Sequence, residues 1–106
     1  MTITSKNLDV ARWQKLSLSK QLANIGSEVS RALGLKEKGD KENTEKSLFR
    51  VLELIDLTIS DQRWEGRRNE IFRLREVVCD IIFGNNIYKT DPKSLKGYFL
   101  FFALNR

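Results

Sequence analysis

Two carboxylates spaced three residues apart, Glu53 and Asp56, are the first candidates for chemistry in this chain. Residues at that spacing share one face of a helix, where paired carboxylates can bind a hard cation such as Mg²⁺. A site of this kind inside a helical bundle also needs an acidic pair on the preceding helix. Glu42 and Glu45 instead lie on the same predicted helix as the candidate pair, and Glu28 is alone on the preceding one. The spacing therefore indicates a metal site without completing it.

The Glu-x-x-Asp spacing is similar to that of helical nucleotide pyrophosphohydrolases, whose carboxylates hold magnesium inside a bundle. This resemblance implies a magnesium-dependent nucleotide hydrolase with Glu53 and Asp56 as metal ligands. The alternative is structural, because the forked guanidinium group of an arginine can satisfy a partly buried carboxylate. Arg31, Arg68 and Arg75 are the nearest in character. We favour the structural interpretation and predict neither a metal nor a cofactor.

Five arginines form a basic cluster between residues 63 and 75, against two glutamates. A basic patch can bind a phosphate backbone by releasing counterions, and a tryptophan beside it can stack on a base. The candidates for nucleic-acid binding are Arg63, Trp64, Arg67, Arg68 and Arg75. A solvated helix face held by salt bridges has the same pattern. We favour that second interpretation and keep nucleic acid as a possible partner.

Two absences exclude several classes of enzyme. The chain has no histidine, which excludes serine-histidine triads, zinc sites with histidine ligands and di-iron bundles of the carboxylate-histidine type. Cys79 is the one cysteine, so no intrachain disulfide or CxxC site exists. With no nucleophile paired to a base, the sequence predicts a non-enzymatic protein. No apolar signal segment and no apolar run of about 18 residues are present, which predicts a cytoplasmic protein without a membrane partner.

The elements that must position these residues are predicted to be helices. The chain has 106 residues, of which 41% are hydrophobic and 31% charged, and Pro92 is its one proline. This balance predicts one all-α domain over residues 1–106. We expect helices over about 18–38, 41–60, 65–83 and 92–104, and leave 1–16 unassigned. Short connections make consecutive helices antiparallel, which gives an up-and-down four-helix bundle.

The first of these helices has two stripes. Its apolar stripe consists of Leu18, Leu22, Ile25, Val29 and Ala32. Beside it runs a stripe of small residues: Ser19, Ala23, Gly26, Ser30 and Gly34. Because small side chains let two helix backbones approach closely, we expect this flank to face a neighbouring helix. Ser17 and Asp91 are the predicted N-caps of the first and last helices, and Gly39 is the predicted residue after the first helix.

Two stretches, residues 49–59 and 98–104, are apolar almost all the way round the predicted helix. A helix with so little polar surface must be enclosed by neighbours or by another chain. The sequence therefore predicts a homo-oligomer or a protein partner, and a function as a protein-interaction or assembly module. The interface candidates are Phe49, Leu57, Tyr98, Phe101 and Phe102.

Three stretches of the chain resemble a group of small uncharacterised all-helical prokaryotic proteins. They are Gly26-Ser27-Glu28-Val29-Ser30-Arg31-Ala32, Leu52-Glu53-Leu54-Ile55-Asp56-Leu57-Thr58-Ile59 and Leu74-Arg75-Glu76-Val77-Val78-Cys79-Asp80. The resemblance covers most of the chain from Trp13 onward. It implies a helical fold and a microbial origin, and it brings no activity, substrate or site residue with it.

Overall fold

The computed structural model describes residues 10–86 and 89–104, with side chains as far as Leu100. Its elements are α1 (Val10–Gln14), α2 (Leu18–Glu37), α3 (Lys41–Ile59), η2 (Gln62–Arg67), α4 (Arg68–Ile82) and α5 (Pro92–Leu104). The predicted all-α class is confirmed. Within these residues, no helix is long and apolar enough to cross a membrane.

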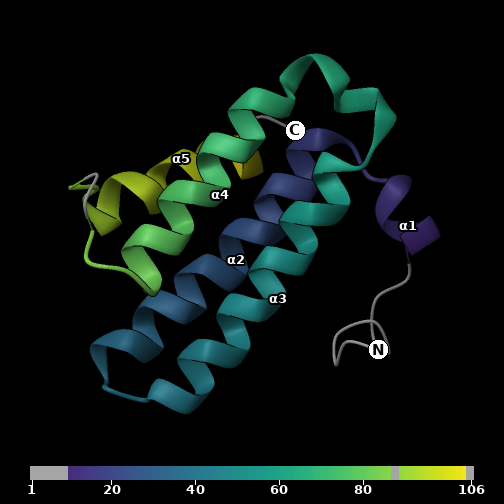
Figure 1. Cartoon of the computed structure of the whole chain (residues 1–106). Helices are drawn as coiled ribbons and strands as arrows, with labels where there is room; N and C mark the ends of the chain where they lie inside the picture. Colours follow the sequence, from purple (N-terminus) through teal and green to yellow (C-terminus); the bar gives the residue numbers. More distant parts are fainter. Residues whose placement is uncertain (1–9, 87–88, 105–106) are drawn as a thin grey trace.

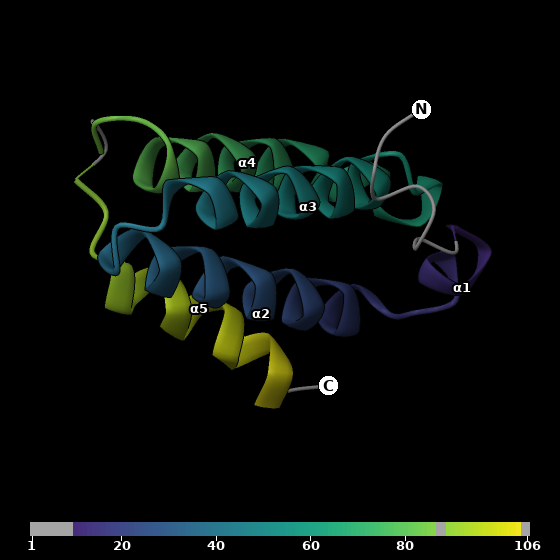
Figure 2. The ribbon, with the colours of Figure 1, turned by 90° about the horizontal axis from the view of Figure 1, so that it is seen from below.

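The four main helices pack in the antiparallel manner that the sequence predicts. Helices α2 and α3 form the largest helix pair, α4 packs on α3, and α5 packs on α2 (Figure 1). Seen from below, α3 and α4 lie on one side of the molecule and α2 and α5 on the other (Figure 2). Helix α1 lies at the end of the bundle where α2 begins.

The two ends of α2 and the start of α5 follow from the local sequence. Ser17 Oγ accepts a hydrogen bond from Lys20 N–H at 3.2 Å and caps α2. Gly39 has a φ of +77° after α2, a conformation that favours glycine because it has no Cβ. Asp91 Oδ1 accepts from Lys93 N–H at 3.1 Å at the start of α5. These predicted helix ends are confirmed.

The start of the third predicted helix is wrong by three residues. Helix α4 begins at Arg68 instead of residue 65, and the 3₁₀ segment η2 precedes it. Asp61 caps η2, since its side chain accepts from the backbone N–H of Arg63 at 3.0 Å. Trp64 has non-helical dihedral angles there (φ −104°, ψ 19°), so the chain is kinked before α4. The kink is a product of tertiary contacts that Trp64 makes, described below.

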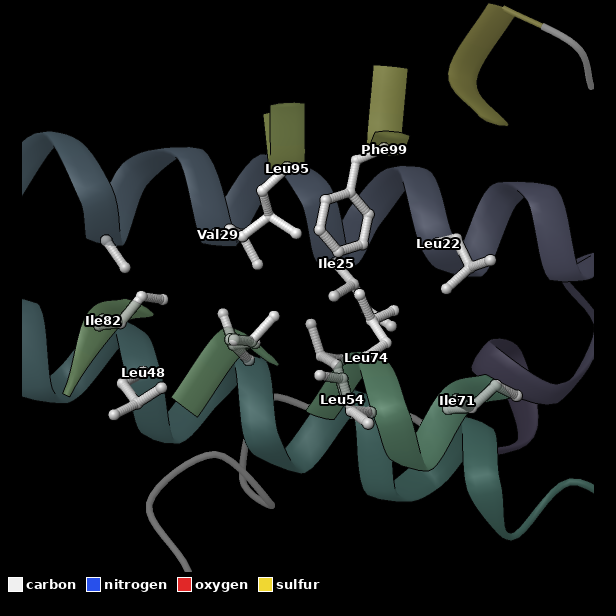
Figure 3. Packing of buried hydrophobic residues seen from close by; sticks show 14 of the residues in the cluster. Leu22, Ile25, Val29, Leu48, Leu54, Ile71, Leu74, Ile82, Leu95 and Phe99 are labelled. Carbon is white, nitrogen blue, oxygen red and sulfur yellow. The ribbon is translucent and has the colours of Figure 1, made fainter. Parts of the chain in front are cut away.

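The core lies where all four main helices meet (Figure 3). The apolar stripe of α2 is buried, with Ile25 and Val29 fully enclosed. Leu95 and Phe99 reach this core from α5, and the Phe99 ring lies beside Ile25 (Figure 3). A Cβ atom at Gly26 would overlap the side chain of Phe99. The prediction that the small residues of α2 face a neighbouring helix therefore holds at Gly26, whereas Gly34 faces open space.

Helix α3 buries one side and leaves the other open. Val51 and Ile55 are fully enclosed, whereas Leu52 is only partly buried. Phe49 is 64% exposed. The helices of this chain therefore do not enclose Phe49, and its enclosure by another chain stays a prediction. The reason is that α3 is covered mainly by α2 and α4, which leaves its outward side open.

Candidate functional site

The basic cluster begins at a buried carboxylate. Asp61 lies between α3 and η2 and is buried. Its Oδ2 accepts from Arg63 Nη2 at 2.7 Å and its Oδ1 from Arg63 Nε at 3.1 Å, so the guanidinium group binds the carboxylate through both oxygens. The hydrogen bond from Arg63 lowers the pKa of Asp61 below its ordinary value, and the same bond raises the pKa of Arg63. The pair is thus held in its charged form.

Gln21 connects this ion pair to both tryptophans. It is fully buried in α2. Its Nε2 donates to Trp13 O at 2.9 Å and to Asp61 Oδ2 at 3.5 Å, and its Oε1 accepts from the indole N–H of Trp64 at 2.9 Å. Arg63 also stacks on Trp64, with 4.4 Å from its Cζ to the ring centroid. One amide side chain therefore links α1, α2 and η2.

The remaining contacts complete what we call the Gln21 network, formed by Trp13, Gln21, Thr58, Asp61, Arg63 and Trp64. The indole N–H of Trp13 donates to Thr58 Oγ1 at 3.2 Å, and that hydroxyl donates to Leu54 O at 3.0 Å. Arg63 Nη2 donates to Leu16 O at 2.9 Å. Since its buried donors and acceptors are bonded to one another, the network fastens α1 and η2 to the end of the bundle.

Sequence reasoning missed Gln21 and Asp61 as members of this cluster. One signal was available: Gln21 lies three residues after Leu18 and four before Ile25, so a polar side chain occupies the apolar face of its helix. A buried amide needs partners, which predicts a polar network without naming its members. Two of its partners, Asp61 and Trp64, lie 40 and 43 positions away in the chain, and no local pattern identifies them.

The other three arginines among the nucleic-acid candidates also bind groups of this chain. Arg67 pairs with Glu70 at 2.5 Å on the surface of α4. Arg68 Nε donates to Ile59 O at 3.0 Å, at the end of α3. Arg75 Nε donates to Asp56 Oδ1 at 2.9 Å. With Arg63 and Trp64 in the Gln21 network, all five candidates have partners within the protein, as the structural interpretation of the cluster requires.

The carboxylate pair on α3 does not act as a unit. Asp56 pairs with Arg75, as the structural interpretation predicts, and this hydrogen bond raises the pKa of Arg75. The Asp56 side chain is 56% exposed, so this carboxylate is only partly buried. Glu53 Oε2 is buried, and no predicted arginine is bonded to it among the described residues. In that part of the chain, no three acidic or cysteine side chains lie close enough together to hold a metal ion.

A groove lies between α4 and α5 in the described part of the structure. Its volume is about 360 Å³, and its surface is predominantly apolar. Leu74, Val77, Leu95 and Tyr98 form its apolar part, and Glu70, Arg73, Thr90 and Ser94 complete the lining. The groove exists because α4 and α5 pack mainly on α3 and α2, respectively, and little on each other.

Tyr98 spans the groove from the α5 side. Its hydroxyl donates to Glu70 Oε1 on α4 at 3.4 Å, and its ring meets Phe99 edge to face with 5.6 Å between centroids. Burial raises the pKa of Tyr98, and the nearby charge of Glu70 raises it further. The tyrosine therefore keeps its proton near neutral pH and can act as a hydrogen-bond donor.

The predicted interface residues are placed on different surfaces. Phe49 lies on the outward side of α3, Leu57 is half-buried against the core, and Tyr98 lines the groove. The side chains of Phe101 and Phe102 lie outside the described residues. The structure therefore does not bring the described candidates together into one patch.

Comparisons with protein-family profiles, with curated proteins and with solved structures found no match for this chain. The resemblance of its three stretches to small prokaryotic proteins stays a prediction.

Proposed function

We propose that this protein is a non-enzymatic protein-interaction module that receives an apolar ridge of a partner helix in the groove between α4 and α5. The observation that carries the proposal is the groove itself, an open apolar channel between two helices. Grooves of this kind bind amphipathic helices through apolar side chains spaced three or four residues apart.

The size and shape of the groove favour a helix over an enclosed small molecule. Ligand pockets have volumes of roughly 300 to 1,000 Å³ and bury most of the ligand. This groove has a volume of about 360 Å³ and is largely open to solvent. It suits one or two large apolar side chains of a partner whose remaining surface stays outside.

Polar groups at the rim can orient the partner. Tyr98 presents a protonated hydroxyl beside Glu70, and Thr90 and Ser94 add hydroxyl groups on the side of α5. These groups can bond to polar residues that flank an apolar ridge. Because the groove is already formed between two folded helices, its lining residues lie close together before the partner binds.

Phosphate-backbone binding is the alternative function that the sequence raised. We give it lower weight because Arg63, Arg67, Arg68 and Arg75 already donate to carboxylate or carbonyl oxygens of this chain. A phosphate would have to compete with those acceptors.

The test begins with a photo-crosslinking amino acid at Ser94, on the rim of the groove, in the native host. Lys96, exposed on the same helix and not part of the groove lining, is the control position. A partner captured at Ser94 is then purified, and its binding to the wild type and to variants is measured by calorimetry.

We expect Val77→Asp to weaken that binding by roughly tenfold or more, because it places a charge in an apolar contact. Leu100→Asp is the matched control, since Leu100 is 57% exposed and does not line the groove. A partner that is captured equally at Lys96, or that binds Val77→Asp as well as wild type, would refute the proposal.

A further inference from the structure

A row of basic side chains lies on the side of α2 that is turned away from α4. Lys36 marks the side that faces α4, because its Nζ donates to Ile81 O at 2.6 Å. Ser27 precedes Lys36 by nine residues, so at about 100° per residue it lies on the opposite side of the helix. Three exposed cations of α2 lie within about 40° of Ser27: Lys20, Arg31 and Lys38.

Helix α5 adds two lysines on the same side of the molecule. Tyr98 and Ser94 line the groove, so they mark the side of α5 that faces α4. Lys96 lies about 160° around the helix from each of them, and Lys93 lies about 60° from Lys96. Both lysines are exposed. They therefore lie on the far side of α5 from the groove, next to the basic row of α2.

The contact between Gly26 and Phe99 sets the register of the two helices. Helices α2 and α5 lie side by side and run antiparallel, with Leu95 beside Val29 (Figures 2 and 3). With a rise of about 1.5 Å per residue, Lys96, Arg31 and Lys93 lie about 4.5, 7.5 and 9 Å from the level of Gly26, all toward one end. On the same rise, Lys20 and Lys38 extend the row to about 27 Å. We call this surface the α2/α5 basic face, formed by Lys20, Arg31, Lys38, Lys93 and Lys96.

The cations of the α2/α5 basic face differ from the arginines between residues 63 and 75, which bind groups of this chain. In the described part of the chain, none of the five forms an ion pair or a side-chain hydrogen bond. Of the described acids near the face, Glu28 pairs with Arg50 of α3, and Asp91 caps α5. Glu37 is then the acid that remains on α2 against five cations. The face is therefore strongly positive, and its charges are available to an outside ligand.

The surface between these cations has little relief and few apolar side chains. It consists of small residues, and a Cβ atom at Gly34 or at Gly97 would meet nothing within 4 Å. The exposed large apolar side chain among its described residues is Leu100. Binding to a membrane surface grows with the apolar area that enters the lipid, and one leucine supplies little. An extended polyanion fits these observations better, because it can approach the backbone closely between the cations.

We propose that the α2/α5 basic face binds the phosphate backbone of a nucleic-acid duplex. The five cations extend over the length of about eight base pairs, at about 3.4 Å per pair. The face has no aromatic side chain among its described residues, whereas single strands are held largely by stacking on aromatic rings. Because backbone contacts carry no sequence information, binding is independent of base sequence. This site is separate from the groove between α4 and α5.

The test measures binding to a fluorescent 20-base-pair DNA duplex of mixed sequence by anisotropy. If about four phosphates are neutralised, the affinity should fall roughly a hundredfold between about 50 and 200 mM salt. Arg31→Glu combined with Lys96→Glu should weaken binding more than about tenfold at the lower salt concentration. The slope of the logarithm of affinity against that of salt should become shallower by about two.

The control reverses the same number of charges elsewhere. Lys46→Glu combined with Arg67→Glu gives the same net charge, on exposed sites of α3 and α4. This variant should keep most of the affinity of the wild type. Circular dichroism checks that each variant is folded. If the Arg31 and Lys96 reversals do not fold together, Lys93→Gln combined with Lys96→Gln should still make the salt dependence shallower.

Four results would overturn the inference. They are a wild type that does not bind the duplex at low salt, equal losses in the two double reversals, a loss confined to the control, and binding to phosphatidylserine vesicles without binding to the duplex. Equal losses would mean that net charge alone acts, and a loss confined to the control would return the site to the arginine cluster. None of these results affects the groove, whose test uses Val77→Asp and a captured protein partner.

Discussion

At the residue scale, Gln21 shows how one polar side chain can organise an end of the bundle. An apolar residue at its position would fill the same space and leave Trp64 Nε1 and Asp61 without partners from α2. Its amide instead bonds to both of them and to the backbone of Trp13. The sequence marks Gln21 as polar on an apolar face, but its partners become visible only when distant segments meet.

Asp61→Asn tests the ionic part of this network. The substitution removes the carboxylate that binds Arg63, so we expect a loss of about 1 to 3 kcal/mol in the free energy of unfolding at neutral pH. The pKa of Asp61 is lowered in the folded state from the ordinary value of 3.8. Its stabilisation is therefore complete above about that pH, and it declines as the pH falls toward the folded pKa.

Urea unfolding at neutral pH and at pH values below about 3.8 would measure this. We expect the difference between wild type and Asp61→Asn to shrink in acid. Asp91→Asn is the control, because asparagine caps a helix as well as aspartate does. If Asp61→Asn lowers the free energy of unfolding by the same amount at both pH values, packing and not charge accounts for the loss.

At the element scale, the contact between α2 and α5 depends on a glycine. The small-residue stripe of α2 predicted a close neighbour, and Phe99 of α5 lies directly on Gly26. The stripe did not predict which helix would be the neighbour, because any apolar helix can pack against small residues.

At the start of α4, tertiary contacts override the local sequence. The sequence permits a helix from residue 65, but the contacts of Trp64 and Arg63 keep η2 as a separate 3₁₀ segment before α4.

Gly26→Ala and Gly34→Ala form a matched pair on α2. A methyl group at Gly26 would overlap Phe99, so α5 must shift, and we expect a loss of about 1 to 3 kcal/mol. At Gly34 a Cβ meets nothing within 4 Å. Alanine there should stabilise the helix by about 0.5 to 1 kcal/mol.

Thermal unfolding measures both changes against wild type. A Gly26→Ala variant as stable as Gly34→Ala would mean that α5 can adjust without cost, and that the two helices are not closely fitted.

At the scale of the whole molecule, the helices differ in how many neighbouring helices they pack against. Helix α2 contacts α3, α4 and α5, whereas α5 is packed chiefly on α2. The described side chains through which α5 enters the core are Leu95 and Phe99. Because α5 has little contact with α4, its detachment would expose less apolar surface than separation of α2 from α3. The same arrangement opens the groove.

Native-state hydrogen exchange should therefore show α5 opening at a lower free energy than α2 and α3. Phe99→Ala should lower that opening free energy further, because it removes the main core contact of α5. Leu100→Ala, at an exposed position on the same helix, should leave it unchanged. Equal protection across all four main helices would contradict this order and show that the bundle opens as one unit.

Much of the fold was predictable from the sequence for local reasons. Helical periodicity, the caps at Ser17 and Asp91 and the turn at Gly39 depend on neighbouring residues, so a sequence pattern carries them. The candidate chemistry was less predictable. Asp56 forms an ion pair with one of its predicted arginines, Arg75, whereas Glu53 bonds to none of them among the described residues. Which arginine reaches a carboxylate depends on helix register, and periodicity does not encode register between helices.

By itself, then, the sequence determined that the chain forms antiparallel helices and which side of α2 is buried, because backbone hydrogen bonds and apolar spacing act over a few residues. Tertiary structure decided that α5 packs on α2 and leaves a groove beside α4, and that Phe49 faces outward. It also decided that the four candidate arginines for nucleic-acid binding, Arg63, Arg67, Arg68 and Arg75, bind groups of their own chain. Each of these depends on contacts between segments far apart in the chain, whose geometry is settled only when all the helices pack at once.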